Sequence, residues 1–111
     1  MPIIHRDLKL ANVVVKKLDR NKNFVCKVTD FGFSTFFDAR STKDLEKIGS
    51  GLYKSPQLFK AGAKVNEKVD IWALGVMTYS MIKGYEEYPF KTEKQVKAGK
   101  IKYDNKFSPE C

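Results

Sequence analysis

Two short stretches of the chain concentrate the residue types that handle phosphate and metal ions. The first runs His5-Arg6-Asp7-Leu8-Lys9-Leu10-Ala11-Asn12, and the second is Asp30-Phe31-Gly32. Together they supply two carboxylates, a lysine and a carboxamide. Carboxylate and amide oxygens suit Mg²⁺, and a lysine with a positioned carboxylate suits phosphate beside a hydroxyl nucleophile. If the fold brings these stretches together, the sequence predicts a site for phosphoryl chemistry.

A β-hairpin is the element that we expect to join the two stretches. The β-rich runs Asn12–Lys16 and Phe24–Thr29 follow the first stretch and precede the second, and the later run alternates at strand period. Between them lie the polar, turn-forming residues 18–23. The open end of the hairpin would therefore hold the residues that carry the chemistry.

The second half of the chain predicts helices. They are expected from Ser55-Pro56 to Gly62, from an Asn66 cap to Lys83 with Gly84 beyond it, and from the capping box Thr92–Gln95 to about Gly99. The middle helix is apolar nearly all round, which predicts burial on every side. Since 111 residues can hardly surround it, the chain is expected to be a piece of a longer domain. Residues 30–57 show no periodicity, and a loop of that length favours a functional role.

Composition limits the classes of function. The length allows one domain, and the longest apolar stretch, residues 69–82, is too short and too interrupted to cross a bilayer. Two cysteines form no disulfide framework and the amino end does not have the pattern of a secretory signal, so we expect an intracellular, cytoplasmic protein without a membrane partner. The net charge of +8 favours phosphate-rich partners, but the lysines are scattered, which makes nucleic-acid binding an unlikely function.

Four motifs in order resemble those of a eukaryotic-type protein kinase. The His-Arg-Asp-Leu-Lys string and the later Asp-Phe-Gly match that family's signature set. Residues 49–57 are similar to its segment ending in Ala-Pro-Glu, and Asp70-x-Trp72-x-x-Gly75 matches its central helix. The resemblance covers residues 1–111 as a partial kinase domain. The fold it implies is α+β by family and mostly α here: the large lobe with a small β-hairpin at the catalytic edge and the small lobe absent.

The resemblance implies a role for each matching polar residue. Asp7 is expected to be the catalytic base for the substrate hydroxyl, and Lys9 to neutralise charge on the transferring γ-phosphoryl group. Asn12 and Asp30 are expected to hold Mg²⁺, so the implied cofactors are ATP and Mg²⁺ and the implied partner is a protein substrate. Lys9 also indicates serine or threonine substrates, and the spacing of 23 residues from Asp7 to Asp30 favours the calcium/calmodulin-dependent group.

Supporting residues follow from the same resemblance. Val14 is expected under the adenine ring and Thr29 beside the nucleotide. Asp70 is expected to anchor the backbone of the catalytic loop. Ser50 stands where the family has a threonine that bridges the base and the lysine. Ser80 stands where relatives that recognise basic substrates have a glutamate, so the sequence does not support a basic recognition motif.

Arg6 marks the subgroup of kinases whose long loop is ordered by a negative charge. The usual phosphothreonine position is occupied here by Glu46. We therefore expect the Glu46 carboxylate to replace the phosphate, to pair with Arg6 and to order the loop without phosphorylation.

Three classes of function remain open. The first is a serine/threonine protein kinase, present as a fragment that is inactive alone. The second is a non-catalytic, kinase-like remnant that acts as a protein-interaction module, and the third is a basic nucleic-acid-binding module. The intact set of Asp7, Lys9, Asn12 and Asp30 favours the first class, whereas the missing small lobe favours the second.

Overall fold

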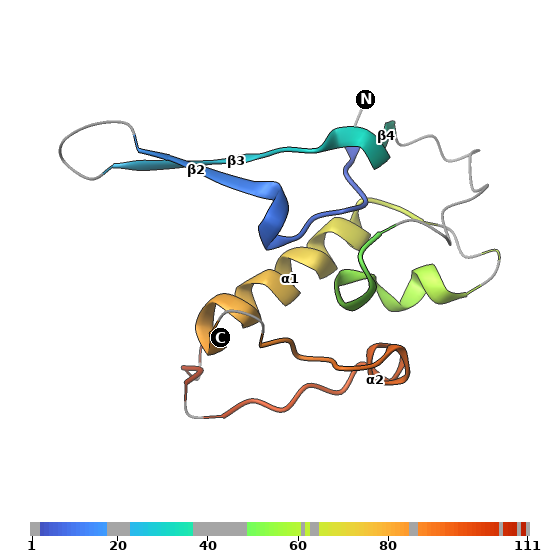
Figure 1. Ribbon diagram of the computed structural model, residues 1–111. Coiled ribbons are helices and arrows are strands. Elements are labelled where there is room, and N and C mark those ends of the chain that lie inside the picture. Colours follow the sequence, from blue (N-terminus) through green and yellow to red (C-terminus); the bar gives the residue numbers. More distant parts are fainter. Residues whose placement is uncertain are drawn as a thin grey trace.

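The computed structural model describes residues 3–17, 23–36, 49–60, 62, 65–84, 87–104, 106–108 and 110. Within these residues the chain forms two small antiparallel sheets, four 3₁₀ turns and two α-helices (Figure 1). In chain order they are β1 (Ile3–Ile4), η1 (Leu10–Asn12), β2 (Val13–Lys17), β3 (Phe24–Val28), η2 (Phe31–Phe33), β4 (Thr35–Phe36), η4 (Gly51–Tyr53), η5 (Pro56–Phe59), α1 (Lys68–Lys83) and α2 (Glu93–Ala98).

The β2–β3 hairpin is confirmed, with boundaries shifted by one residue. Val13 pairs with Val28, Val15 with Cys26, and Lys17 with Phe24. The ribbon extends away from the helices (Figure 1). Its residues are mostly exposed because the described part of the chain places little against either face.

A second, very short sheet was not expected from the sequence. β1 pairs with β4, with Ile3 opposite Phe36 and Ile4 opposite Thr35. The pairing joins the start of the chain to the segment that follows η2. Ile4 is buried and belongs to a core cluster with Leu58, Val65 and Val69, so this small sheet connects the segment of residues 5–12 to the helical part.

Helix α1 ends at Lys83 with Gly84 beyond it, as expected, but begins one residue later than expected, with Glu67 rather than Asn66 at the N-cap position. Its first residue, Lys68, donates its backbone N–H to the Asn66 side chain at 3.1 Å, and Gly84 ends it with a φ of 131°. One face is buried, whereas Ile71 and Met81 are 58% and 62% exposed. The described elements cover only one side of the helix, which agrees with the expectation that 111 residues can hardly surround it.

The open side of α1 borders a groove of about 650 Å³. Aromatic side chains line much of it, among them Trp72, Tyr79 and Phe107. Trp72 stacks on Phe90 with the ring centroids 5.5 Å apart. None of the helices in the described ranges is long and apolar enough to span a membrane.

The capping residues in the sequence predicted α2 well but predicted too long a helix at η5. Helix α2 is capped at its start by Thr92, whose hydroxyl accepts the Gln95 N–H at 3.3 Å, and at its end by Gly99, which has a φ of 64°. The helix expected from Ser55 to Gly62 is reduced to the single turn η5. Ser55 is buried and makes no capping hydrogen bond, and the backbone is already extended at Lys60.

Candidate active site

Residues 5 and 6 are fastened to helix α1 by a single carboxylate. Asp70 accepts the backbone N–H of His5 at 2.7 Å and that of Arg6 at 2.9 Å. Arg6 has a φ of 68°, a left-handed conformation that costs a non-glycine residue about 1–2 kcal/mol. The two charge-assisted hydrogen bonds offset this strain. Asp70, from the first turn of α1, thus fixes the direction in which the chain enters residue 7.

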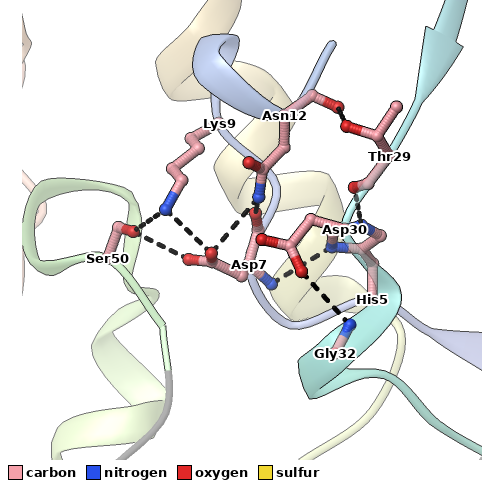
Figure 2. Close-up of polar contacts among 8 residues, drawn as sticks. All are labelled: His5, Asp7, Lys9, Asn12, Thr29, Asp30, Gly32 and Ser50. Atoms are coloured by element: carbon pink, nitrogen blue, oxygen red, sulfur yellow. Dashed lines mark hydrogen bonds and ion pairs between the residues drawn. The ribbon is translucent and has the colours of Figure 1, made fainter.

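The Asp7 carboxylate is the centre of a hydrogen-bonded network (Figure 2). It is 4% exposed. Its Oδ2 lies 2.9 Å from the Lys9 ammonium and accepts the Asn12 amide at 3.2 Å, while its Oδ1 accepts the Ser50 hydroxyl at 2.7 Å. The Lys9 ammonium also donates to the Ser50 Oγ at 2.9 Å. Asp7, Lys9 and Ser50 therefore form a closed triangle of polar contacts.

This network decides the protonation state of Asp7. Burial alone would raise the pKa of the Asp7 carboxyl. The hydrogen bonds from Lys9 and Ser50, the charge of Lys9 and the amide of Asn12 outweigh burial and together hold that pKa below its usual value. Asp7 is thus an anion at neutral pH, with both oxygens held in fixed directions.

Ser50 comes from a distant part of the chain, and a glycine allows its approach. Gly49 has a φ of 105°, which only glycine adopts readily, and a Cβ built there would lie 3.0 Å from the Arg6 carbonyl oxygen. Residue 49 therefore lies directly against the backbone of Arg6. This contact brings the Ser50 hydroxyl within reach of Asp7 and Lys9.

Asn12 links the catalytic loop to the hairpin. Its side-chain amide donates to the Asp7 carbonyl at 2.8 Å, and its own carbonyl accepts the Thr29 N–H at 2.9 Å and the Thr29 hydroxyl at 3.3 Å. The Thr29 carbonyl in turn lies 3.0 Å from the His5 Nε2. Thr29 is therefore bonded on both sides, and Asp30, the next residue, is brought to the same end of the hairpin.

Asp30 is positioned by its own backbone rather than by direct bonds to the network. It has a left-handed φ of 61°, and its Oδ1 accepts the Gly32 N–H at 3.3 Å. The following residue, Phe31, packs its ring edge-on against His5 at 4.8 Å. The Asp30 side chain is exposed, and it lies beside the Asp7 network at the open end of the hairpin (Figure 2).

The remaining predicted residues lie around this core. Val14, on β2 opposite Lys27, is 48% exposed. Arg6 donates its Nε to the carbonyl of Phe33, a contact that local sequence signals did not indicate. Burial lowers the pKa of Arg6, while the nearby Asp70 charge raises it. Glu46 lies outside the described residues, so the expected Arg6–Glu46 pair stays a prediction.

Ser80 takes no part in the site. It is 1% exposed, and its hydroxyl donates to the Glu87 carbonyl at 2.6 Å. It therefore holds Glu87 against α1.

Comparison with known proteins decides the family. A family model of the protein kinase domain matches residues 1–109. The chain belongs to the protein kinase family. The resemblance to eukaryotic-type serine/threonine kinases is confirmed, and this kinase chain has relatives of that type in several organisms.

Three curated relatives show how similar the chain is to known serine/threonine kinases. A serine/threonine-protein kinase CLA4 of Candida albicans is 40% identical over 86% of the chain and 9% of its own length. Calcium-dependent protein kinase 4 of Plasmodium falciparum is 34% identical over 92% of the chain and 19% of its own length. Serine/threonine-protein kinase ppk25 of Schizosaccharomyces pombe is 33% identical over 98% of the chain and 26% of its own length. The kinase chain thus spans about a quarter or less of each of these relatives.

Proposed function

We propose that this kinase chain carries the catalytic loop of a serine/threonine protein kinase, which transfers the γ-phosphoryl group of ATP to protein hydroxyls. The observation that carries the proposal is the buried Asp7 anion, held between the Lys9 ammonium and the Ser50 hydroxyl. A fixed anion beside a fixed cation is what phosphoryl transfer requires, because catalysis there depends on positioning and charge stabilisation.

Each residue has a distinct task in this proposal. Asp7 accepts a hydrogen bond from the substrate hydroxyl, orients its oxygen and receives its proton as transfer proceeds. Lys9, whose side chain is 28% exposed, directs its ammonium toward the charge of the transferring group. Ser50 keeps both side chains in register, since its hydroxyl donates to Asp7 and accepts from Lys9.

The donor set of Asn12 and Asp30 fits Mg²⁺ bound to ATP. Bound Mg²⁺ would supply charge neutralisation on the phosphates. The two side-chain hydrogen bonds from Asn12 to Asp7 use the amide nitrogen, which leaves the amide oxygen as the metal ligand, and the Asp30 carboxylate is exposed at the same end of the hairpin. Among the described residues no three acidic, histidine or cysteine side chains gather. Phosphate and water would therefore complete the coordination shell, as is usual for Mg²⁺.

The nucleotide would lie along the hairpin, with the adenine over Val14 and Thr29 beside it. We assign the chain to the large lobe of the kinase domain, because its sequence contains no glycine-rich phosphate-loop motif. ATP would therefore be held from one side only. We expect weak ATP binding and poor transfer by this chain in isolation.

The second candidate is a non-catalytic module that binds partner proteins. The observation in its favour is the open apolar side of α1, including Ile71 and Met81. Both candidates share the fold but differ in metal-dependent nucleotide binding, which only the first requires.

A paramagnetic titration separates the two. Mn²⁺·ATP, with Mn²⁺ replacing Mg²⁺, is added to the ¹⁵N-labelled chain, and line broadening is mapped by residue. We expect broadening at Asn12, Thr29 and Asp30, and about tenfold weaker binding for Asp30→Asn, since it removes the charged metal ligand. Asp104→Asn, an exposed change of the same kind, is the control. Broadening elsewhere, or equal binding by both variants, contradicts the proposal.

A further inference from the structure

One face of the β2–β3 ribbon carries the residues that the nucleotide would cover. In an antiparallel pair, residues directly opposite each other share a face, and so do residues two apart along a strand. Val14 lies opposite Lys27. Thr29 follows Lys27 by two residues and continues the ladder, since its N–H donates to the Asn12 carbonyl at 2.9 Å. Val14, Lys27 and Thr29 therefore share one face of the ribbon, which we call the nucleotide face.

The Lys27 side chain has no protein partner on this face. It is exposed, and within the described part of the chain its ammonium takes part in no hydrogen bond or ion pair. Lys16, opposite Val25, lies on the same face but farther from the open end of the hairpin. Like charges at such diagonal positions repel each other. The repulsion favours conformations in which the Lys27 ammonium extends toward Thr29 and the open end.

The open end of the hairpin carries more negative than positive charge. It holds the carboxylates of Asp7 and Asp30 but only the ammonium of Lys9, which already lies 2.9 Å from Asp7 (Figure 2). The charge of nearby Arg6 is offset by that of Asp70. The outer phosphates of a nucleotide would share Mg²⁺ with these carboxylates. The phosphate next to the ribose, the α-phosphate, would still need a cation.

Lys27 is placed to supply that cation. An antiparallel strand advances about 3.4 Å per residue, so the step from Thr29 back to Lys27 covers about 7 Å along the ribbon. With the purine over Val14 and the outer phosphates at Asn12 and Asp30, the ribose and the α-phosphate occupy this interval. A lysine side chain that extends along the ribbon spans most of it, so the ammonium reaches the α-phosphate while the stem stays beside the base.

We propose that Lys27 binds the α-phosphate of the nucleotide, with its aliphatic stem beside the base over Val14 and its ammonium turned toward the open end of the hairpin. The inference rests on the proposed function for the position of the nucleotide. It adds to that site a residue that distinguishes nucleotides with a 5′-phosphate from the bare nucleoside. Lysine suits this task because its compact ammonium binds phosphate as a point charge.

Metal-free titrations of the 111-residue chain test the proposal. Adenosine and AMP are added separately to the ¹⁵N-labelled chain in the presence of a chelator, and the amide shifts of Val14, Lys27 and Thr29 give the two dissociation constants. AMP differs from adenosine only by the phosphate in question. We expect AMP to bind about threefold more tightly than adenosine, and this gain to shrink as salt is added, because an exposed charge pair is screened.

Variants assign the gain to one ammonium. Lys27→Met keeps an aliphatic stem and should abolish the gain for AMP while leaving adenosine binding unchanged. Lys27→Arg keeps the charge and should retain the gain. Lys17→Met, which removes the same charge from the opposite face of the same ribbon, is the matched control and should bind AMP as the unmodified chain does. Thermal melts check that every variant remains folded.

The outcomes separate this inference from the kinase function. Equal binding of AMP and adenosine overturns the inference, as does an equal loss for Lys17→Met, which would indicate a general effect of net charge. An equal loss of AMP and adenosine binding in Lys27→Met also overturns it, because the stem rather than the ammonium would then matter.

The Mn²⁺·ATP titration supplies the second readout. If Mn²⁺·ATP broadens Asn12 and Asp30 but Lys27→Met binds AMP normally, the proposed function stands and the role of Lys27 fails. If AMP binding depends on Lys27 while Mn²⁺·ATP leaves those two residues unbroadened, the α-phosphate contact stands and the proposed function fails. The absence of any nucleotide binding contradicts both.

Discussion

Replacing Asp70 with asparagine tests how strongly helix α1 holds the catalytic loop. The carboxylate accepts two backbone N–H groups, at 2.7 and 2.9 Å. An asparagine offers its oxygen to one of them and turns its own NH₂ group toward the other. A hydrogen bond to a charged group contributes about 1.5–3 kcal/mol, and an unsatisfied buried donor costs a similar amount. We therefore expect Asp70→Asn to lower the free energy of unfolding by about 2–4 kcal/mol.

Because the backbone of Arg6 is left-handed, we expect Asp70→Asn to change the conformation of residues 5–7 as well as the overall stability. Its φ of 68° carries strain that the Asp70 hydrogen bonds offset, so weakening them favours relaxation of residues 5–7. A total stability of about 5–15 kcal/mol is usual for a domain of this size. Asp70→Asn therefore removes a substantial share of it and releases the Asp7 carboxylate from its fixed direction.

Two measurements follow the change. Urea unfolding is monitored by the fluorescence of Trp72, the only tryptophan of the chain, which lies two residues from position 70. Hydrogen exchange of the His5 and Arg6 amides reports the local release. Asp104→Asn, which breaks an exposed ion pair with Lys83, is the matched control and should change both readouts much less. If the two variants lose equal stability and the amides of residues 5 and 6 stay protected, Asp70 does not anchor the loop.

Four further predictions concern the site and its support. Ser50→Ala should raise the pKa of Asp7 because a hydrogen bond to the carboxylate is lost, whereas Ser50→Thr should preserve it, as a ¹³C carboxylate titration would show. The pKa of Asp7 is lower in the folded than in the unfolded chain, so its ionisation stabilises the fold above about pH 5. This stability is lost as the pH falls from about 3.9 through the folded-state pKa, and acid unfolding of Asp7→Asn should lack that loss. Thr92→Ala should cost about 1 kcal/mol by removing the cap of α2, measured by thermal unfolding, with Thr92→Ser unaffected. Phe90→Ala should cost about 3–5 kcal/mol and shift Trp72 emission to the red, since Phe90 is 1% exposed and stacks on that ring; an unchanged spectrum would contradict the stacking.

The sequence predicted the elements whose formation depends on residues close together in the chain. The hairpin follows from strand alternation and turn residues, and α1 and α2 follow from their caps and terminal glycines. The capping box predicted at Thr92 is half formed. The Thr92 hydroxyl accepts the Gln95 N–H, but the Gln95 side-chain oxygen accepts the N–H of Lys91 rather than that of Thr92. The shortened turn at Ser55 shows the limit of such signals: a serine followed by proline indicates a helix start, but the Ser55 hydroxyl makes no capping hydrogen bond and only a single turn forms.

The site itself could be assembled from the sequence only through the family resemblance. Residues 5–12 and 30 flank a hairpin, so their proximity follows from it. In contrast, Ser50 and Asp70 come from distant segments, and neither composition nor periodicity places them beside Asp7. The bond from Arg6 to the Phe33 carbonyl and the pairing of β1 with β4 were not predicted at all, since both join segments about 30 residues apart.

The contact between Gly49 and the Arg6 carbonyl has a consequence for variation at position 49. A single methyl group there would have to push the two backbones apart, and the left-handed φ would resist it as well. The displacement would withdraw the Ser50 hydroxyl from both of its charged partners without altering any of the polar side chains. The hydrogen atom at this position of Gly49 thus sets how closely two distant segments can meet, and an alanine there would strain the approach of Ser50 while leaving every one of the reactive groups in the chain.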